Sequence, residues 1–298
     1  MKVATEFTLP SGRGAAPDLA QGSVFFVGTA TVLIRYAGFT ILTDPNFLHR
    51  HQQARLGYGL RSTRLTDPAL EIRDLPPLDL LVLSHYHGDH FDYVAERELD
   101  KLQPIVTTPH AEQALRRRGF AVPIPLHTWS AVGFARGGAR LQIAATPGQH
   151  GPLGVASLLP PVMGSVLQFA TGAGGPLVTL YITGDTLAIT ALQEIPRRFP
   201  NIDLALLHLG GTRILGIMVT RDGRQGAEAM RLVNPRLAIP IHYNDYTVFK
   251  SPLDEFKRRV EAAGLEDRVR YLAHGETHTF HIAPERLAAA QAMPELVR

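Results

Sequence analysis

The chain has no cysteine among its 298 residues. Disulfide bonds and thiolate chemistry are therefore excluded, and a metal ion would have to be held by histidine, aspartate or glutamate. The chain also lacks an uncharged apolar run of about 18 residues, so we expect no membrane span. Its first ten residues lack the apolar stretch of a secretory signal, and we therefore expect a cytoplasmic protein.

Charge of either sign is sparse, and the formal net charge is only +3. Short basic clusters at 116–118 and 257–259 fall on expected helices and are typical of solvated faces. Because no basic stripe with interleaved aromatic residues is present, we expect no nucleic-acid partner. The excess of arginine remains compatible with a small anionic substrate. A homo-oligomer is compatible with the sequence, which leaves the assembly state open.

The apolar runs predict an α/β protein. From residue 23 onward, β-rich runs separated by tight turns are followed by helices mixed with strands, and this mixture then recurs. Such an order favours two sheets with helices packed outside them. We expect residues 1–22, rich in glycine, proline and alanine, to be loosely held, and 23–298 to form one domain. Residues 46–76 are expected to form a long loop, and loops of that size often cover a site.

The stretch LVLSHYHGDHFD at residues 81–92 places three histidines and an aspartate within six positions after a buried strand. Residues two apart in an extended chain point to the same side, so His85 and His87 can reach one ion. Gly88 allows a sharp turn, after which Asp89 and His90 face a second point. Imidazole nitrogen and carboxylate oxygen are ligands of zinc and similar divalent ions. Polar residues of an exposed loop are the alternative, but the density of such groups argues against it.

Four other apolar runs end in a residue able to bind metal. These residues are Asp44, His150, Asp185 and His242. Taken singly, Asp44 suits a turn cap, His150 a surface loop and His242 a core imidazole. Their joint occurrence beside the 85–90 cluster favours one shared metal site.

Counting ligands predicts two ions. One would take His85, His87 and His150, and the other would take Asp89, His90 and His242, with Asp185 bridging the two. Two ions about 3.5–4 Å apart can hold a hydroxide between them as the nucleophile. Asp44 would then accept a hydrogen bond from a ligand imidazole and fix its tautomer.

Two side chains are candidates for catalysis itself. Asp89 is one, in addition to its role as a ligand. His208, at the end of a further strand, is the first candidate for donating a proton to the leaving group or for holding substrate, although a core or surface imidazole explains it equally well. Arg213 is a candidate contact for an anionic group, with an exposed arginine as the alternative. The apolar stretch 158–163 either covers an apolar part of the substrate or buries itself against a helix.

The full pattern resembles the metallo-β-lactamase superfamily. It consists of His-x-His-x-Asp-His at 85–90, followed by His150, Asp185 and His242, with Asp44 ahead of them. The resemblance implies a four-layer αββα sandwich with a dinuclear site at the shared edge of two mixed sheets. The runs Leu42–Pro45, Ser84–His90 and Thr183–Asp185 are similar to the N-acyl-phosphatidylethanolamine phospholipase D-like and ascorbate-6-phosphate lactonase-like branch.

Three functions are consistent with these residues. The first is a metal-dependent hydrolase of a phosphodiester or other small ester, with two divalent ions, zinc first and manganese or iron as alternatives. The second is a lactone or amide hydrolase that uses the same site. The third is a metal-binding redox or sensor protein. Relatives of that kind favour a carboxylate in place of one histidine, whereas position 87 is histidine, so we rank it below hydrolysis.

Overall fold

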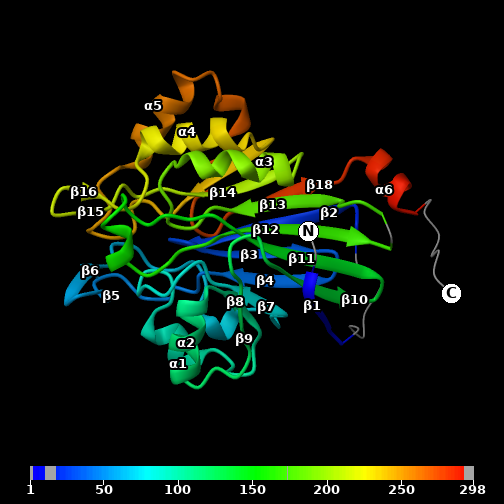
Figure 1. Cartoon of the computed structure of the whole chain (residues 1–298), viewed down its shortest axis with the longest axis horizontal. Helices are drawn as coiled ribbons and strands as arrows, with labels where there is room; N and C mark the ends of the chain where they lie inside the picture. The colour runs from blue at the N-terminus through cyan, green and yellow to red at the C-terminus, as the bar shows by residue number, and fades with distance from the viewer. Residues whose placement is uncertain (1–2, 11–17, 173, 292–298) are drawn as a thin grey trace.

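The computed structural model describes residues 3–10, 18–172 and 174–291. At its centre lie two seven-stranded sheets that face each other across a hydrophobic core, with helices on both outer sides (Figure 1). The strands of the first sheet are β2 (Gln21–Gly28), β3 (Thr31–Tyr36), β4 (Phe39–Thr43), β7 (Leu80–Val82), β8 (Ile105–Thr107), β9 (Pro123–Pro125) and β18 (Thr277–His281). Those of the second sheet are β1 (Val3–Thr8), β10 (Ala131–Arg136), β11 (Ala139–Thr146), β12 (Gly164–Thr171), β13 (Val178–Ile182), β14 (Leu204–His208) and β17 (Leu237–Ile241).

Both sheets are mixed. The order in the first is β18-β2-β3-β4-β7-β8-β9, and it changes from antiparallel to parallel pairing at β4. The second follows the order β1-β10-β11-β12-β13-β14-β17, with antiparallel hairpins in the middle and the parallel strands β13, β14 and β17 at one side. The predicted arrangement of two mixed sheets flanked by helices is therefore confirmed.

Six helices and two short ribbons complete the described chain. The helices are α1 (Tyr93–Glu98), α2 (Pro109–Arg117), α3 (Glu194–Arg198), α4 (Gly223–Val233), α5 (Leu253–Glu261) and α6 (Pro284–Gln291). Single 3-10 turns occur at Ile72–Asp74, Ala156–Leu158, Thr190–Gln193 and Glu266–Arg268. The ribbons are β5 (Gln53–Gly57) with β6 (Leu60–Thr63), and β15 (Arg213–Ile214) with β16 (Ile217–Met218). Figure 1 shows α3, α4 and α5 on one side of the sheets and α1 and α2 on the opposite side. None of the helices among the described residues is long and apolar enough to span a lipid bilayer.

Local sequence explains where several helices begin and end. The Thr108 side chain accepts a hydrogen bond from the Ala111 amide, and Pro109 occupies the first turn of α2, where its missing N–H costs nothing. Asp222 caps α4 in the same way through the amide of Gln225. Asn234 ends α4 in a left-handed conformation, which asparagine tolerates better than most residues.

The main core fills the space between the sheets. It joins residues of β2, β3 and β4 to residues of β10 through β14, so each sheet buries its apolar inner face against the other. Phe169 on β12 lies at the middle of this core and is fully buried. Its ring lies 5.3 Å from that of Tyr36 and 6.2 Å from that of Phe39, both from the first sheet. A second cluster packs α1 and α2 against the outer face of the first sheet.

Two segments differ from the sequence-based expectation. Within the segment predicted to be loosely held, Val3–Thr8 forms β1 and pairs in parallel with β10, whereas residues 1–2 and 11–17 lie outside the described part. Phe7 stacks on Phe134 at 5.5 Å, and this contact anchors the strand. The loop expected over 46–76 contains the β5–β6 ribbon. The sequence did not predict this pairing, because apolar and polar residues do not alternate along the two strands.

The packing of Phe169 gives a prediction for stability. Replacing it with alanine leaves a cavity between the sheets, so the free energy of unfolding should fall by about 3–5 kcal/mol. Chemical denaturation of the two proteins measures the difference. Leu102→Ala is the matched control, because Leu102 is 69% exposed and its loss should change stability by less than about 0.5 kcal/mol. Equal effects of the two substitutions would contradict the described core.

Candidate metal centre

The metal-capable residues lie at one edge of the two sheets because they follow strands that end there. Asp44 follows β4, and His85 and His87 follow β7 of the first sheet. His150 follows β11 of the second sheet. In that same sheet Asp185 follows β13, His208 is the last residue of β14, and His242 follows β17. The carboxyl ends of parallel strands meet at the same edge, which brings these residues together.

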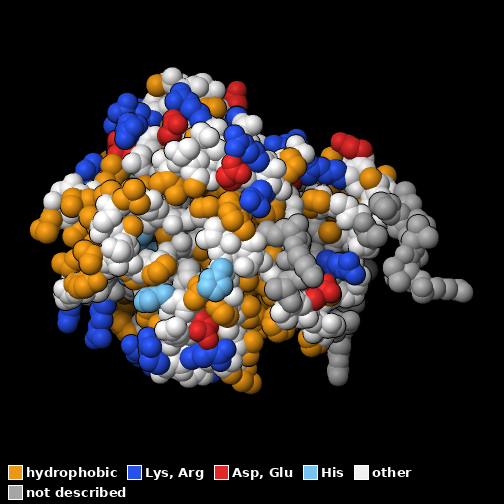
Figure 2. All heavy atoms as spheres, viewed as in Figure 1, with side chains coloured by type: hydrophobic (Ala, Val, Ile, Leu, Met, Phe, Trp, Pro, Cys, Tyr) orange, Lys and Arg blue, Asp and Glu red, His pale blue; other side chains and the backbone are white. Residues whose placement is uncertain are grey.

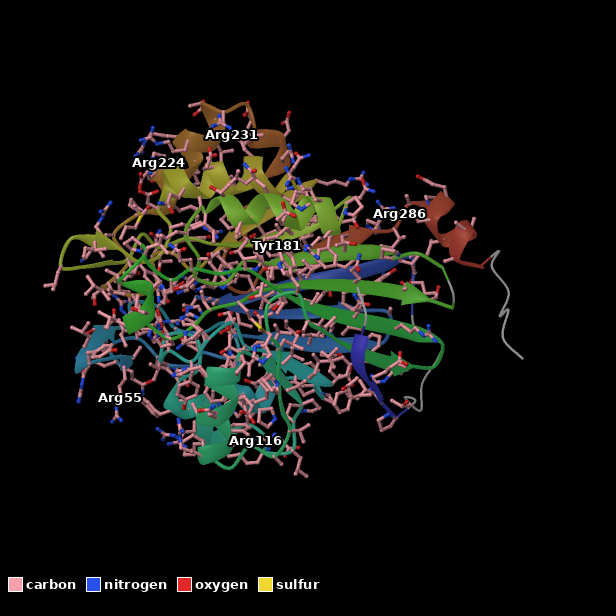
Figure 3. The ribbon with its side chains drawn as sticks, in the orientation of Figure 1. Arg55, Arg116, Tyr181, Arg224, Arg231 and Arg286 are labelled. Carbon is pink, nitrogen blue, oxygen red and sulfur yellow. The ribbon has the colours of Figure 1, made fainter. Side chains whose placement is uncertain are left out.

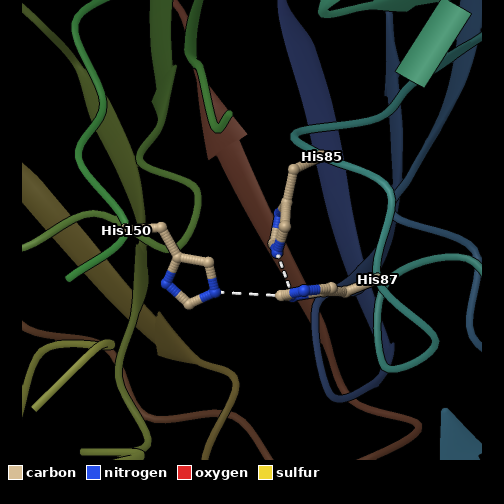
Figure 4. Close-up of side chains that lie close together, drawn as sticks. All are labelled: His85, His87 and His150. Atoms are coloured by element: carbon tan, nitrogen blue, oxygen red, sulfur yellow. Dashed lines mark hydrogen bonds between the residues drawn. The ribbon is translucent and has the colours of Figure 1, made fainter. Parts of the chain in front are cut away.

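The first group consists of His85, His87 and His150, whose ring nitrogens all lie within 4.8 Å of one another. The Nδ1 of His87 lies 3.1 Å from the Nε2 of His85 and 3.4 Å from the Nε2 of His150 (Figure 4). All three side chains are buried. Three imidazoles converging on one point leave room for little except a small cation or its water ligands.

The second group consists of Asp89, His90, Asp185 and His242, which again place ligand atoms within 4.8 Å of one another. The Nε2 of His90 lies 3.4 Å from Asp185 Oδ2, and the Nε2 of His242 lies 3.6 Å from Asp89 Oδ2. The Nδ1 of His242 lies 3.5 Å from the other oxygen of Asp185. The structure therefore divides the seven residues into the two predicted groups, with Asp185 in the second.

Unpartnered polar atoms show that these residues fit a bound cation. Five buried polar atoms of these two groups have no hydrogen-bond partner among the described residues: His87 Nε2, Asp89 Oδ1, His90 Nε2, Asp185 Oδ1 and His242 Nε2. A buried polar atom without a partner costs about 1–3 kcal/mol, and such atoms are rare in folded proteins. Such a concentration of unpartnered polar atoms is expected at a metal site, because the side chains there bond to the ion and not to one another.

The protonation of the imidazoles differs between the groups. Burial lowers the pKa of His85 well below its usual value and lowers that of His87 to about 3, so both rings are neutral and able to bind metal. Burial also acts to lower the pKa of His90 and His242, but Asp185 together with Asp44 at His90 and with Asp89 at His242 outweighs it and raises both. Protons on these rings supply the positive charge that the buried carboxylates need, and a divalent cation would replace them.

Hydrogen bonds to backbone carbonyls fix two ligand tautomers. The Nδ1 of His150 lies 2.9 Å from the carbonyl oxygen of Val219, and the Nδ1 of His242 lies 3.1 Å from that of Leu209. Because a carbonyl only accepts, Nδ1 must carry the proton in both rings, and Nε2 is left as the ligand atom. The Thr220 hydroxyl similarly donates to Asp185 Oδ2 at 3.1 Å. Carbonyl partners have no signature in the sequence.

Asp44 and Ser84 form the support behind the ligands. Asp44 Oδ1 accepts hydrogen bonds from the Ser84 amide at 2.7 Å and the Ser84 hydroxyl at 3.0 Å. That hydroxyl also lies 3.0 Å from His85 Nδ1 and 3.4 Å from His90 Nδ1. Burial acts to raise the pKa of Asp44, but His208 and His90 outweigh it and lower the pKa to about 2. Asp44 thus lies behind the rings of His85 and His90, and Ser84, which no sequence motif indicated, lies between them.

His208 lies behind the second group. Its ring is fully buried and stacks on that of His90 at 5.8 Å. Its Nε2 lies 3.4 Å from Asp44 Oδ2, and its Nδ1 lies 3.3 Å from the Thr183 hydroxyl. Asp44, His90 and His208 also place ligand atoms within 4.8 Å of one another. The structure thus joins His208 to Asp44, and its side chain does not line the cleft described next.

A cleft of about 700 Å³ opens beside His87. The β5–β6 ribbon, α1 and residues 156–161 form its walls, and Leu56, Phe91 and Leu159 make much of its lining apolar. The ribbon is held close to the metal-binding turn at Gly88, whose amide donates to the Arg55 carbonyl at 3.0 Å. A Cβ atom at this glycine would lie 2.6 Å from the Arg55 backbone, so only glycine permits the contact.

Two residues at the site have strained backbones. Asp44 has a φ of 33° and His242 has a φ of 61°, both in the left-handed region that residues other than glycine seldom adopt. Such conformations cost about 1–3 kcal/mol each and persist only where surrounding contacts impose them. The amide of His242 donates to the Thr29 carbonyl, and that of Asp44 donates to the Val82 carbonyl. These bonds hold both strained residues in place.

Comparison with known proteins agrees with this geometry. A metal-dependent hydrolase from Aeropyrum pernix is 29% identical over 269 residues, covering 86% of this chain and 96% of that protein. An N-acyl-phosphatidylethanolamine-hydrolyzing phospholipase D from Caenorhabditis elegans is 26% identical over 281 residues, covering 88% of this chain and 77% of that protein.

Solved structures have the same fold. An isothiocyanate hydrolase from Delia radicum gut bacteria superimposes with a TM-score of 0.72 at 22% identity, covering 88% of this chain and all of the other. A possible metal-dependent hydrolase from Veillonella parvula gives the same TM-score and coverage at 21% identity. The sequence pattern of the beta-lactamase superfamily domain matches residues 40–243, a range that contains both groups and Asp44. The chain therefore belongs to the beta-lactamase superfamily and has the metallo-β-lactamase fold.

Proposed function

We propose that this protein, a metal-dependent hydrolase of the metallo-β-lactamase family, holds two divalent ions and hydrolyses a phosphodiester or other small ester. The observation that carries the proposal is the pair of buried groups, in which five polar atoms have no hydrogen-bond partner among the described residues. Their nitrogen and oxygen donors suit zinc first, with manganese or iron as alternatives.

The chain's own residues divide between the two ions. His85, His87 and His150 would hold the first, and Asp89, His90 and His242 the second. Asp185, which has two carboxylate oxygens, would lie between them. Two such ions supply Lewis-acid polarisation of the scissile group and lower the pKa of a water that they bind. We assign Asp89 to catalysis as well as ligation, because its Oδ2 lies 3.6 Å from His242 Nε2 while its Oδ1 is buried without a hydrogen-bond partner among the described residues.

The supporting residues keep the ligands in place for this chemistry. Ser84 and Asp44 hold His85 and His90 from behind, so each ring presents a fixed nitrogen to the site. We propose that His208 acts through Asp44, because its ring contacts the Asp44 carboxylate and is shielded from the cleft. This position favours a positioning role over the predicted contact with substrate.

The cleft beside His87 supports a substrate with an apolar moiety. Its walls are mostly apolar, and Arg55 and Arg118 also line it. A molecule with an anionic ester beside a hydrocarbon part would match both features. Among the relatives, the phospholipase D is named for a phosphodiester substrate of this type, which supports the same chemistry here. Residues 159–161 lie in the wall, in keeping with the predicted role of the apolar stretch 158–163 as a cover.

Metal content tests the ligand groups. The purified protein should contain about two divalent ions per chain, and His87→Ala should retain about one, because this change removes a ligand from the first group only. Inductively coupled plasma mass spectrometry measures the stoichiometry. His110→Ala is the matched control, since His110 lines the cleft but belongs to neither group. A protein that never takes up divalent ion would contradict the proposal.

Turnover tests the reaction class. Bis(p-nitrophenyl) phosphate should be hydrolysed by the metal-loaded protein, and Asp89→Ala should reduce this to background because the second ion is lost. Asp74→Ala, which changes an exposed aspartate, should leave turnover unchanged. A panel of lactones and amides run beside the diester separates the alternative. Hydrolysis of lactones or amides alone would remove the phosphodiester proposal, and oxygen consumption without any hydrolysis would favour a redox protein.

The support behind the ligands gives a separate prediction. Asp44→Asn keeps the size of the side chain but removes the charge that holds His90 and His208, so metal affinity should fall about 10–100-fold. Competition with a chelating dye measures that affinity. Asp74→Asn serves as the control. Unchanged affinity in Asp44→Asn would show that Asp44 serves the fold alone.

A further inference from the structure

Three loop tips expose large hydrophobic side chains near the cleft. The turn of the β5–β6 ribbon carries Tyr58, 78% exposed, and the turn of the β15–β16 ribbon carries Leu215, 97% exposed. The loop between them in space carries Leu153 and Leu158, which are 88% and 60% exposed. We call these three tips, residues 57–60, 153–158 and 214–217, the apolar rim. Large apolar side chains gathered in this way on a surface commonly mark a binding site.

Hydrogen bonds join the three loops that carry the rim. The Tyr58 hydroxyl donates to the Leu158 carbonyl at 2.6 Å, which joins the first tip to the second. The second and third tips meet at their bases, where the ring of His150 bonds to the Val219 carbonyl. In Figure 1 all three loops lie along the left-hand edge of the molecule, and Figure 2 shows hydrophobic side chains gathered along that edge.

The charges around the rim have one sign. The segments 53–63, 150–163 and 212–219 contain no aspartate or glutamate, yet they carry three exposed arginines, Arg55, Arg61 and Arg213. Arg55 and Arg61 stand directly opposite each other on the β5–β6 ribbon, a pairing of like charges that costs stability. None of the three forms an ion pair with a residue in the described part of the chain. Their charge is therefore available to an anionic partner.

We propose that the apolar rim docks on an anionic lipid surface, with its hydrophobic tips among the lipid headgroups and its arginines against their phosphates. Single Leu and Tyr side chains projecting from separate loops, with arginines at their bases, suit shallow insertion into a lipid surface. A second copy of the chain fits less well, because a two-fold contact through this face would bring the same arginines together. Docking would place the mouth of the cleft at the lipid surface.

The proposal can be tested without any turnover. Sedimentation with vesicles of equal parts phosphatidylglycerol and phosphatidylcholine should recover the protein, whereas phosphatidylcholine vesicles should recover much less. Leu215→Ser should weaken binding by roughly tenfold, because one exposed leucine no longer enters the lipid. Leu102→Ser is the matched control, since Leu102 is 69% exposed on the turn before β8, away from the rim. Thermal melting of each variant checks that it is folded.

The electrostatic part has its own matched pair of variants. Changing Arg55, Arg61 and Arg213 together to Gln should weaken binding by about a hundredfold, since each arginine near an anionic surface contributes roughly a fivefold gain. Changing Arg116, Arg197 and Arg231 to Gln removes the same charge from exposed positions outside the rim and should have little effect. In Figure 3, Arg55 is labelled at the lower left, near β5, and Arg231 at the top, near α4.

Several outcomes would overturn docking on lipid. These are no binding to anionic vesicles, equal binding to neutral ones, and equal losses in the rim and control variants. A dimer in solution that Leu215→Ser dissociates, without vesicle binding, would assign the rim to a second copy instead. The metal-deficient His87→Ala protein should bind vesicles like the parent, so failure of the hydrolase proposal leaves this test intact.

Discussion

Carboxylates and imidazoles buried at the shared edge of two sheets are costly to hold, because a low-dielectric interior penalises charge and unpartnered polar atoms. Here seven such side chains converge, and five of their polar atoms have no partner in the part of the chain that the structure describes. The carboxylates in turn raise the pKa of His90 and His242, which favours positive charge on these rings. The arrangement depends on positive charge at its centre, and the surrounding hydrogen bonds are organised to keep the ligands aimed at that point.

That organisation uses the ends of strands. Parallel strands fix the positions of Asp185, His208 and His242 to within a side chain's reach, since β13, β14 and β17 are neighbours in one sheet. The strained backbones of Asp44 and His242 then turn their side chains toward the site. The two sheets bury a large apolar core, and the free energy gained by this burial offsets the cost of the strained backbone.

The same edge also carries the loops that line the cleft. The β5–β6 ribbon rests on Gly88 of the metal-binding turn, and the loop that supplies His150 continues into the tip bearing Leu153 and Leu158. Ligands, cleft and apolar rim are thus parts of the same few segments.

The sequence by itself determined the ligand types, their approximate grouping and the class of fold. These features are local patterns: imidazoles at alternate positions, and metal-capable residues at the ends of apolar runs. Local patterns of this kind can be recognised from the sequence alone. The tertiary structure alone decided the rest. The Val219 and Leu209 carbonyls fix tautomers through backbone atoms that no residue type encodes, and His208 took its place beside Asp44 because β14 is inserted between β13 and β17. β1 owes its pairing with β10 to contacts across a long sequence separation, which a linear pattern does not contain. The β5–β6 ribbon is local, but its strands lack the alternation of apolar residues that would have predicted it.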